Sequence, residues 1–402
     1  MAIKEKFFSY LMFRPKGRKP DEKVDEYGLI KFGADRPDVD IYCEGYTKLE
    51  KEIASMMKNF RIYKYSSLLE IPFVISFNRG YLVESYFLKV IGKSPLVVDK
   101  PDQANAFVIP ATPLMYYSLV QQIWNLWGLI RPSIDVNSEE IILKRRKWEG
   151  KLLLEALKKP LKSPYFQEGQ NHVYFSSKLG TEFIEQVNEP IFKNGVLVVN
   201  SADAKRGYFN PQKDVSSVCM KDYKIPKYAY DIAAFDRSYE EREYYTYYAG
   251  MIYGQRGWVH EKRTENCLWI DRHVPFGEYL ANYSRSKFYF HFPGSSEWSP
   301  RLFEGMWFGA VPVVLYDQYT LPFSDVLDWS KFAVLIHMDQ IQETYAILEQ
   351  ITREEWQDKR AHLKVALKHF AYHKKPVFGD AFYMTMYSIY KRINSAGEHQ
   401  KS

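Results

Sequence analysis

One loop, together with the helix expected after it, holds the residue types best suited to binding an anion. We predict a strand over Phe288–Phe292, a loop over Pro293–Pro300 and a helix over Arg301–Phe308. The loop holds one glycine and three serines, and the first turn of a helix carries backbone N–H groups that attract phosphate. Arg301 adds a planar guanidinium that matches phosphate or carboxylate oxygens. The segment therefore predicts a site for a nucleotide diphosphate.

Glu304 lies one turn after Arg301 on the same helix face, where its carboxylate could accept hydrogen bonds from ribose hydroxyls. The same residues also fit a plain strand–helix–strand unit without a ligand. Ser299 would then be the N-cap, Pro300 the first helical residue and Glu304 an acidic residue of the first turn. Local spacing alone favours this structural explanation.

The elements that must position these residues alternate along the whole chain, which predicts an α/β fold with right-handed crossovers. Most of the predicted strands are continuous apolar runs, as expected for strands buried on both faces of a parallel sheet. The predicted strands are Val39–Cys43, Val97–Val98 leading into Ala106–Pro110, Val173–Ser176, Val196–Asn200, Ile232–Phe235, Phe288–Phe292, Val311–Tyr316 and Phe332–Ile336. The predicted helices are Leu49–Asn59, Tyr81–Ile91, Leu114–Trp127, Glu139–Leu157, Glu240–Tyr253, Phe276–Tyr283, Arg301–Phe308, Ile341–Gln350 and Glu354–Phe370.

Composition narrows the class of protein. Hydrophobic residues make up 46% of the 402 residues and charged residues 26%, which is typical of a folded chain and excludes a disordered one. The net charge of +6 is spread along the chain, so we expect no nucleic-acid partner, and we interpret the basic run at 144–147 as a solvated helix face. Three dispersed cysteines predict neither a zinc site nor a disulfide scaffold.

No apolar run is long enough to span a bilayer, so we expect no transmembrane segment. The run Phe7–Phe13 is short and flanked by Lys and Arg; it predicts either a packed terminus or a weak contact with a membrane surface. A cytoplasmic location follows as an expectation, with association to the Golgi through a partner as the alternative. The sequence leaves the oligomeric state open.

A break in periodicity between residues 205 and 230, where Gly207, Pro211 and Pro226 cluster with charged residues, divides the chain. We predict a tail at 1–25, an N-terminal domain at 26–220, a C-terminal domain at 221–392 and a second tail at 393–402. Two α/β domains facing each other would form a cleft beyond the carboxyl ends of their strands.

Four groups of motifs, in a fixed order, carry a resemblance to a known family. The segment from Ser286 to Trp329 contains Ser-Lys-Phe, Pro-Gly, Arg-Leu-Phe-Glu, Gly-x-x-Pro-Val, Leu-Pro-Phe and Asp-Trp. Upstream lie Tyr-x-x-Glu-x-x-Phe from Tyr81, Pro-Asp-Gln-Ala from Pro101 with a strand that closes at Pro110, and Phe-x-Pro-x-Lys-Asp-Val from Phe209. In these residues the chain resembles the exostosin-like glycosyltransferases, glycosyltransferase family 47, over roughly residues 39–370.

The resemblance implies a GT-B architecture of two Rossmann-like domains, with the acceptor groove on the N-terminal domain and the donor sugar on the C-terminal one. It also implies an inverting transfer from a UDP-sugar to a glycan or glycoconjugate, without a metal ion. Helix-terminal N–H groups and arginine would then stabilise the leaving diphosphate. Asp38-Val39-Asp40 could suggest a metal site, but it precedes the first strand and we interpret it as a solvated loop.

Carried over position by position, the resemblance assigns donor-nucleotide contacts to eight residues. Six lie in the loop and helix after Phe292: Gly294, Ser295, Ser296, Ser299, Arg301 and Glu304. Two more follow the predicted strand Ile232–Phe235. Arg242 is the better match for a diphosphate-facing side chain and Arg237 is a close alternative, and each could equally be a surface arginine paired with a nearby glutamate.

An inverting transfer needs a base within reach of the acceptor hydroxyl. The candidates are His172, Asp214 and Glu84, and each has a structural alternative. The family tends to have Asp-His where this chain has Asn171-His172, which weakens the case for the imidazole. This departure motivates a second hypothesis, a non-catalytic exostosin-like subunit that binds glycan or forms a complex.

Overall fold

The computed structural model describes residues 40–67, 83–131, 135–177, 190–207, 209–218, 237–294, 297–373 and 375–398. Several predictions fall elsewhere: the tail at 1–25 with its apolar run Phe7–Phe13, the strand Ile232–Phe235, and the donor contacts Ser295 and Ser296 all lie outside the described residues.

The N-terminal half forms a parallel sheet of five strands in the order β1-β2-β3-β4-β5. Its strands are β1 (Ile62–Lys64), β2 (Ala106–Val108), β3 (His172–Ser176), β4 (Val196–Val199) and β5 (Val215–Ser216). Its helices are α2 (Tyr46–Asn59), α3 (Val83–Ile91), α4 (Pro113–Ile130), α5 (Glu139–Leu161) and α6 (Pro190–Asn194). The central strands β3 and β4 are buried along their whole length, as expected for strands covered on both faces.

The C-terminal half forms a second parallel sheet of five strands in the order β10-β9-β8-β6-β7. Its strands are β6 (Tyr244–Ala249), β7 (Cys267–Ile270), β8 (Ser286–His291), β9 (Val311–Tyr316) and β10 (Val334–His337). Its helices are α9 (Gln255–Glu261), α10 (Phe276–Ser284), α11 (Arg301–Glu304) and α12 (Thr344–Glu349). The predicted α/β class, with one Rossmann-like sheet in each half, is confirmed.

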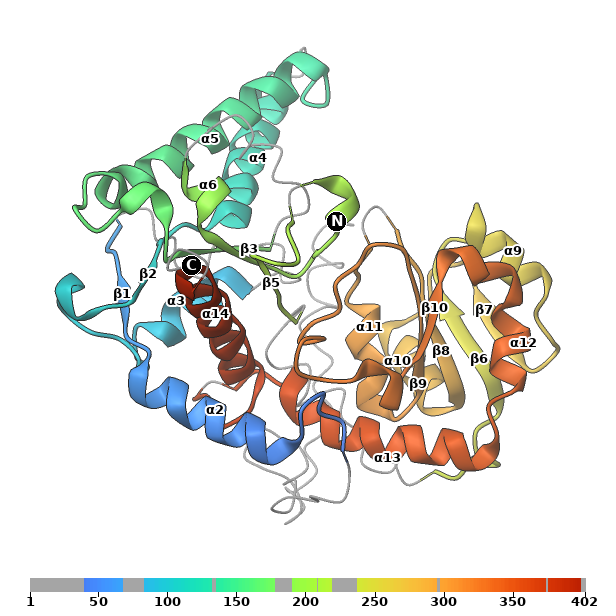
Figure 1. Cartoon of the computed structure of the whole chain (residues 1–402). Coiled ribbons are helices and arrows are strands. Elements are labelled where there is room, and N and C mark those ends of the chain that lie inside the picture. The colour runs from blue at the N-terminus through green and yellow to red at the C-terminus, as the bar shows by residue number, and fades with distance from the viewer. Residues whose placement is uncertain are drawn as a thin grey trace, which may run out of the picture.

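Two helices at the end of the chain tie the halves together. α13 (Arg353–Phe370) starts at a capping box in which Thr352 and Glu355 bond each other's backbone amides. It runs along the second sheet toward the first, and α14 (Ala381–Glu398) then packs on α2, β4 and β5 of the first half (Figure 1). The chain therefore returns to the N-terminal sheet after completing the C-terminal one.

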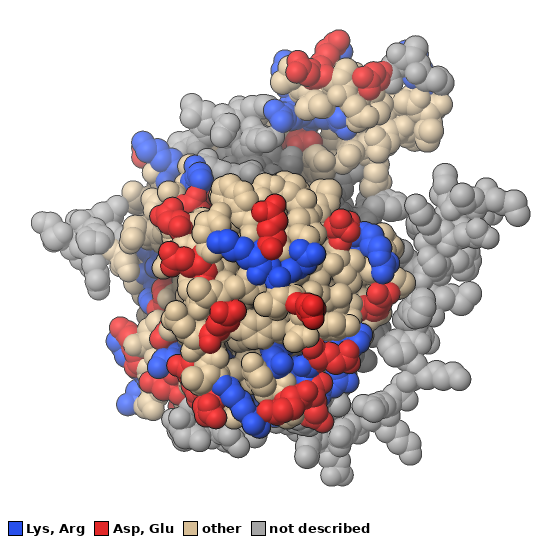
Figure 2. Space-filling view, turned by 90° about the vertical axis from the view of Figure 1, so that its right-hand side faces the viewer, with Lys and Arg blue, Asp and Glu red and all other residues tan. Residues whose placement is uncertain are grey.

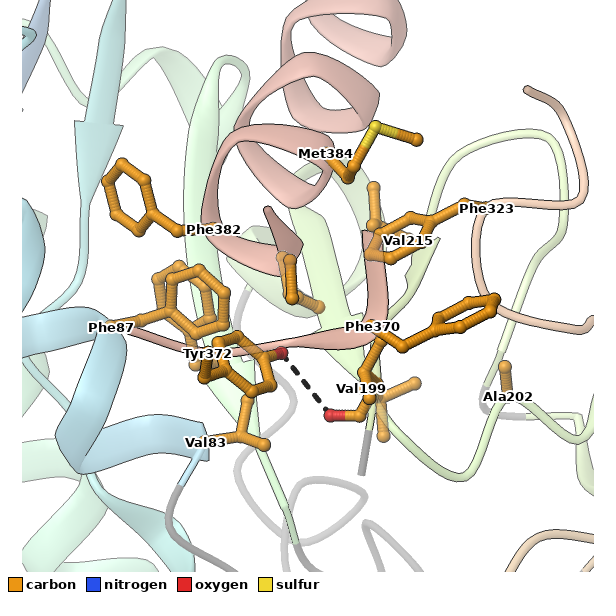
Figure 3. Packing of buried hydrophobic residues seen from close by; sticks show 14 of the residues in the cluster. Val83, Phe87, Val199, Ala202, Val215, Phe323, Phe370, Tyr372, Phe382 and Met384 are labelled. Carbon is orange, nitrogen blue, oxygen red and sulfur yellow. Dashed lines mark hydrogen bonds between the residues drawn. The ribbon is translucent and has the colours of Figure 1, made fainter. Parts of the chain in front are cut away.

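One hydrophobic core continues from one half to the other. Phe87 and Val199 from the first half meet Phe323 and Phe370 from the second, and Phe382 of α14 lies beside Phe87 (Figure 3). The Tyr372 hydroxyl donates to the carbonyl of Val218 at 3.3 Å within this cluster (Figure 3). The halves are thus joined by packed apolar side chains.

The segment around residue 245 differs from the sequence prediction. The helix predicted over Glu240–Tyr253 is wrong, because Tyr244–Ala249 is the strand β6, paired with β7 on one side and β8 on the other. Its sequence, Tyr-Tyr-Thr-Tyr-Tyr-Ala, is rich in residues that favour strands, and the charged residues around 240–243 lie before it. The predicted strand at Val39–Cys43 is reduced to a single bridge between Tyr42 and Leu327.

Other predicted elements have small differences in extent. The helix predicted over Arg301–Phe308 breaks into α11 and the 3₁₀ turn Met306–Phe308, which ends at Gly309 with φ 69°. α14 extends through residues 393–398, where the sequence predicts a tail.

The domain limits stay a prediction, as does the cytoplasmic location. Within the described ranges, the structure contains no helix long and apolar enough to cross a membrane.

Candidate active site

The carboxyl ends of the strands of the two sheets meet. The loops after β4 and β9 exchange backbone hydrogen bonds: the amide of Ala204 donates to the carbonyl of Gln318 at 3.1 Å, and the amide of Thr320 donates to that of Ala202 at 2.9 Å. Ligands of open parallel sheets bind beyond the carboxyl ends of the strands. Residues that handle a ligand are therefore expected at this junction.

Arg301 begins α11, just after β8, and its guanidinium is held by β6. Nη2 donates to the carbonyl of Ala249 at 2.8 Å, and the guanidinium carbon lies 5.0 Å from the centre of the Tyr248 ring. The Nε atom is buried and has no hydrogen-bond partner among the described residues. Arg301 is thus fixed in direction and keeps one N–H donor unused.

Gly250 provides the space that this arginine occupies. A Cβ atom at position 250 would lie 2.8 Å from the Tyr248 hydroxyl oxygen and 3.1 Å from Nη2 of Arg301. Both distances are tighter than ordinary van der Waals contact, so a side chain here would displace the tyrosine or the arginine. The sequence analysis missed Gly250, since its role appears only once β6 is placed beside α11.

Glu304 is buried one turn after Arg301 and is held by a pair of tyrosines. The hydroxyl of Tyr279 donates to Oε2 of Glu304 at 2.5 Å, and the hydroxyls of Tyr279 and Tyr283 are 2.7 Å apart. Burial, reinforced by the negative charge of Glu304, raises the pKa of Tyr279 well above its ordinary value, so its phenol stays a hydrogen-bond donor. The carboxylate keeps one orientation at the start of α11.

The loop before α11 is anchored by a neutral histidine. His291, the last residue of β8, is fully buried, and burial lowers its pKa to about 3. Its Nε2–H donates to the carbonyl of Glu297 at 2.9 Å, so Nδ1 accepts from the Ser299 hydroxyl at 3.4 Å. Ser299 therefore bonds the imidazole side chain and makes no side-chain cap of α11, whose N-cap is Pro300.

Glu297 is a functional candidate that the sequence analysis missed. It is 8% exposed, and its Oε2 accepts from the amide of Asp317, which follows β9, at 3.3 Å. Asp317 in turn pairs with Lys205 of the first half at 2.5 Å. Burial raises the pKa of Glu297, and the negative charges of Asp203 and Asp317 add to the effect against the lowering by Lys205 and the Asp317 amide. A carboxyl with a raised pKa thus lies between loops of both halves.

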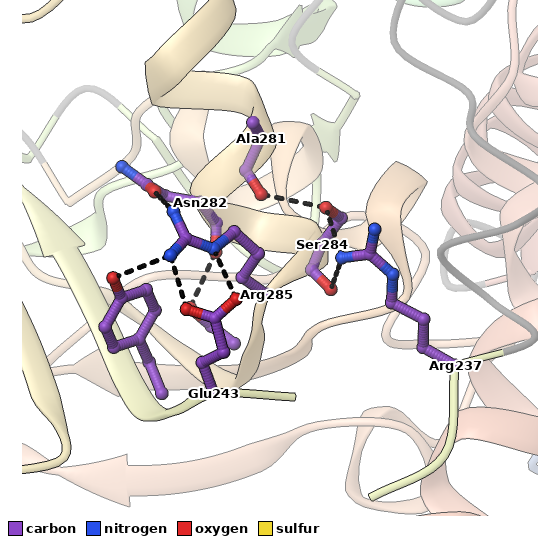
Figure 4. Close-up of polar contacts among 8 residues, drawn as sticks. Arg237, Glu243, Ala281, Asn282, Ser284 and Arg285 are labelled. Carbon is purple, nitrogen blue, oxygen red and sulfur yellow. Dashed lines mark hydrogen bonds and ion pairs between the residues drawn. The ribbon is translucent and has the colours of Figure 1, made fainter. Parts of the chain in front are cut away.

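Arg237 and Arg242 lie at the opposite edge of the second sheet, before the strands begin. Arg237 donates to the carbonyl and the hydroxyl of Ser284 at 3.1 Å each, while Arg285 pairs with Glu243 beside it (Figure 4). Arg242 is 1% exposed and donates to the carbonyls of three residues: Tyr283, Ser286 and Phe308. Neither arginine is brought together with Arg301, and both stabilise turns that lead into strands.

Two of the predicted bases lie at the amino ends of strands. His172 starts β3 and is fully buried; its Nδ1–H donates to the carbonyl of Gln170 at 2.8 Å, so Nε2 accepts from the Tyr65 hydroxyl at 3.1 Å. Burial lowers its pKa to about 4. Asp214 is 2% exposed and accepts from the amides of Leu197 and Asn210 at 3.0 and 2.8 Å. Both side chains are used inside the first half.

Glu84 lies at the carboxyl edge of the first sheet, where a ligand would be expected, but its carboxylate is buried and bonded within the protein. Its carboxylate accepts from the amide of Ser177 after β3 at 2.6 Å and from the amide of Leu114 in the first turn of α4 at 3.1 Å. It is 1% exposed. The contacts are those of a buried carboxylate that joins a strand end to a helix start.

Polar side chains with unused hydrogen-bonding capacity collect at the carboxyl edge of the first sheet. They follow four neighbouring strands, and their buried oxygen or nitrogen atoms have no partner in the described part of the chain. The residues are Thr112 after β2, Ser176 at the end of β3, Asn200 after β4, and Ser216 and Ser217 at the end of β5. Such groups are costly to leave unpaired, which indicates a surface that a polar ligand could satisfy.

Two parallel α/β sheets whose carboxyl edges meet define a protein of the GT-B class, as the sequence predicts. The exostosin GT47 domain model matches residues 41–351. The chain therefore belongs to the exostosin GT47 family of glycosyltransferases.

The names of two relatives agree with this assignment. The chain is 26% identical to "Probable glycosyltransferase At5g25310" of Arabidopsis thaliana, over 90% of this chain and 74% of the relative. It is 28% identical to "Probable glucuronosyltransferase GUT1" of Oryza sativa subsp. japonica, over 44% of this chain and 47% of the relative. Among solved structures it is similar to an alpha,alpha-trehalose 6-phosphate synthase from Burkholderia multivorans, with a TM-score of 0.35 and 8% identity over 81% of this chain and 82% of that one.

Proposed function

We propose that this glycosyltransferase transfers a sugar from a UDP-sugar to a glycan or glycoconjugate acceptor, with inversion and without a metal ion. The observation that carries the proposal is the arrangement of Arg301 and Glu304 at the carboxyl edge of the second sheet. Arg301 has an unused Nε–H beside the loop that follows β8, and Glu304 has a fixed carboxylate one turn later. These two groups fit a diphosphate and a ribose.

The leaving UDP acquires negative charge as the bond between the anomeric carbon of the sugar and the diphosphate oxygen breaks. A guanidinium fixed by Ala249 and Tyr248 can stabilise that charge without reorganising. This supports a mechanism in which the protein supplies the positive charge.

The acceptor is proposed to bind at the carboxyl edge of the first sheet. The unpaired side chains there, Asn200 above all with both amide atoms unsatisfied, offer donors and acceptors for sugar hydroxyls. The hydrogen bonds between the loops after β4 and β9 join this edge to the donor side. Acceptor and donor would then meet at the junction.

Glu297 replaces the three earlier candidates as the proposed base. His172, Asp214 and Glu84 are each buried and bonded within the first half, whereas Glu297 lies at the junction. Burial raises the pKa of Glu297, so its carboxylate accepts a proton from an acceptor hydroxyl more readily than an ordinary glutamate. Inversion follows from a single displacement in which this base removes the proton while UDP leaves.

Calorimetry with UDP and a panel of UDP-sugars, with and without EDTA, tests the donor site, and UDP-glucuronic acid is the first donor to try because of the rice relative's name. We expect UDP binding that EDTA does not weaken. Loss of binding in EDTA would overturn metal independence. Failure of every UDP-sugar to bind would overturn the donor assignment.

Glu297→Gln tests the base separately, with Glu278→Gln on the exposed start of α10 as the matched control. We expect turnover to fall by about 10²-fold or more with UDP affinity retained. Wild-type turnover in the Glu297 variant would show that another group removes the proton. UDP binding without turnover in the wild-type chain would favour the non-catalytic subunit instead.

A further inference from the structure

The antiparallel pair α4 and α5 forms a hairpin that extends away from the first sheet. α4 packs along α5, and both stand at the top of the molecule in Figure 1 and again in Figure 2, which is turned by 90° about the vertical axis. Val120, Trp124 and Ile141 form a small cluster inside the hairpin that is separate from the main core. The far end of the hairpin is therefore supported by its own packing.

The hairpin exposes an unusual share of the molecule's apolar side chains. Seven of the thirteen large hydrophobic side chains that are exposed in the described ranges lie on it. They are Leu126, Trp127, Leu129, Ile130, Leu143, Trp148 and Leu154. Leu129 is 79% exposed and Ile130 69% exposed, at the end of the helix farthest from the sheet. Contiguous apolar surface of this kind marks a binding surface.

The exposed face of α4 is continuous and uncharged. None of the 18 residues of α4 is Asp, Glu, Lys or Arg. Ile123, Leu126 and Ile130 follow the spacing of one helix face, and Ile123 is partly exposed while the other two are exposed. Two glutamines and an asparagine interrupt the apolar sequence of this helix, and the helix is not apolar enough to cross a membrane. Such a helix suits the boundary of a bilayer.

Basic side chains border this apolar face. Between residues 131 and 161 the sequence has eight Lys and Arg against five Asp and Glu. Of the acidic side chains, Glu149 is 3% exposed, Glu140 and Glu155 pair with nearby lysines, and Asp135 and Glu139 are exposed near the start of α5. Lys147 and Lys151 are exposed on α5. The hairpin thus carries more positive than negative charge, with exposed lysines along α5 behind its apolar tip.

Trp127 and Arg131 bring an apolar and a basic side chain of the hairpin close together. The guanidinium of Arg131 lies 5.9 Å from the centre of the Trp127 ring, and Trp124 contacts both Trp127 and Trp148. Tryptophan next to arginine is typical of side chains at the level of lipid headgroups, where one end is apolar and the other is wet.

We propose that the α4–α5 hairpin docks the protein on an anionic lipid surface. The tip inserts Leu126, Leu129 and Ile130 among the acyl chains, while the basic side chains of α5 contact lipid phosphates. On the face that Figure 2 shows, Lys and Arg are interspersed with Asp and Glu.

Two other candidates for binding the hairpin fit its charge less well than an anionic lipid surface does. A second copy of the chain in a symmetric dimer would place the basic face against itself. The chain's own residues 1–39 hold nine Lys and Arg against seven Asp and Glu, so they offer no net negative charge to the basic side chains of the hairpin.

Sedimentation of the full chain with vesicles tests the proposal, using phosphatidylcholine alone or with about one-third phosphatidylserine. We expect the anionic vesicles to bind at least about tenfold more tightly, with the difference reduced by salt. Absence of binding to anionic vesicles would overturn the proposal and leave an acidic protein as the alternative partner.

Leu129→Ser together with Ile130→Ser tests the insertion, and we expect affinity for anionic vesicles to fall by about tenfold or more. Val377→Ser together with Phe378→Ser is the matched control, since it removes another adjacent pair of exposed apolar side chains, between α13 and α14. The control should bind like the wild type. Equal losses in both variants, or no loss in the first, would overturn the assignment to the hairpin.

Lys147→Gln together with Lys151→Gln tests the charge. We expect weaker binding to anionic vesicles by about tenfold, no change with neutral ones and a smaller salt effect. Unfolding temperatures of all variants check that the fold is retained. An unchanged preference for anionic vesicles in this variant would overturn the electrostatic part of the proposal.

Discussion

The two carboxyl edges that meet at the junction are built differently. At the edge of the second sheet, Arg301, Glu304 and His291 are held by hydrogen bonds within the protein, and Nε of Arg301 is left without a partner in the described residues. At the edge of the first sheet, Asn200 and Ser217 keep buried polar atoms without partners in the described residues. Fixed groups favour a charged ligand that needs exact orientation, and unpaired groups favour a ligand that completes their hydrogen bonds.

The difference fits the two substrates proposed above, a nucleotide sugar and an acceptor glycan. A nucleotide has one diphosphate with a constant geometry, so its site can be assembled in advance. An acceptor glycan presents many hydroxyls, and the side that receives it must supply several donors and acceptors. Substitutions at the two edges should therefore have different effects on stability and on substrate affinity.

We expect the largest effect, on UDP affinity, from Arg301→Gln at the carboxyl edge of the second sheet. The variant loses the positive charge that faces the proposed diphosphate, and UDP affinity should fall by about 10²-fold or more. Calorimetry with UDP measures the change, and Arg263→Gln, at an exposed position just after α9, is the control. Retention of wild-type affinity would place the diphosphate elsewhere.

The next largest effect that we expect is a pH dependence of the folding stability, which arises from His172 in the first half. Its pKa is lowered to about 4 in the folded protein against 6.5 as the ordinary value, because burial disfavours the imidazolium. The stability that this neutral histidine contributes is complete above pH 6.5 and is lost as the pH falls to about 4, by up to about 3 kcal/mol.

Urea unfolding of the wild type and of His172→Phe at several pH values between 7 and 4 measures this contribution. The variant should lose less stability on acidification than the wild type. A parallel fall in both proteins would show that His172 titrates normally and remains accessible, as a catalytic base would require.

Gly250→Ala should have a smaller effect that is confined to the second edge. The added methyl would lie against the Tyr248 hydroxyl and Nη2 of Arg301, and we expect a loss of about 1–3 kcal/mol in stability or in UDP binding. Thermal unfolding and calorimetry separate the two. Gly277→Ala in α10, where a Cβ meets nothing within 4 Å, is the control.

The smallest change in stability is expected from Ser217→Ala at the first edge. Its buried hydroxyl has no partner to lose, so the free energy of unfolding should stay within about 0.5 kcal/mol or rise. The KM for the acceptor should rise nevertheless if the hydroxyl binds sugar. A clear loss of stability would mean that the two edges do not differ as described.

The sequence by itself determined the segment around residue 300 and the class of fold. The strand, loop, helix and strand between residues 286 and 316 follow from apolar runs, Pro300 and Gly309, all of which act over a few residues. The motif order, too, is a linear property, and it identified the family that matches residues 41–351.

Only the tertiary structure decided at which edge of a sheet each side chain lies. With a helix over Glu240–Tyr253, Arg242 would have followed a strand and faced the donor. Because Tyr244–Ala249 is itself the strand, Arg242 precedes it and lies at the opposite edge. A single change of element type therefore moves a side chain across the sheet, and short-range patterns with many aromatic residues do not resolve it.

The sequence also did not predict which candidate bases are buried or which groups they bond. Glu84, His172 and Asp214 have the residue types of a base, yet their partners include backbone amides and a tyrosine from other parts of the chain. Glu297 carries no local signal and becomes a candidate because burial raises its pKa and because Asp203 and Asp317 from separate loops add to that rise. Electrostatic environment is set by neighbours in space, which a linear pattern does not specify.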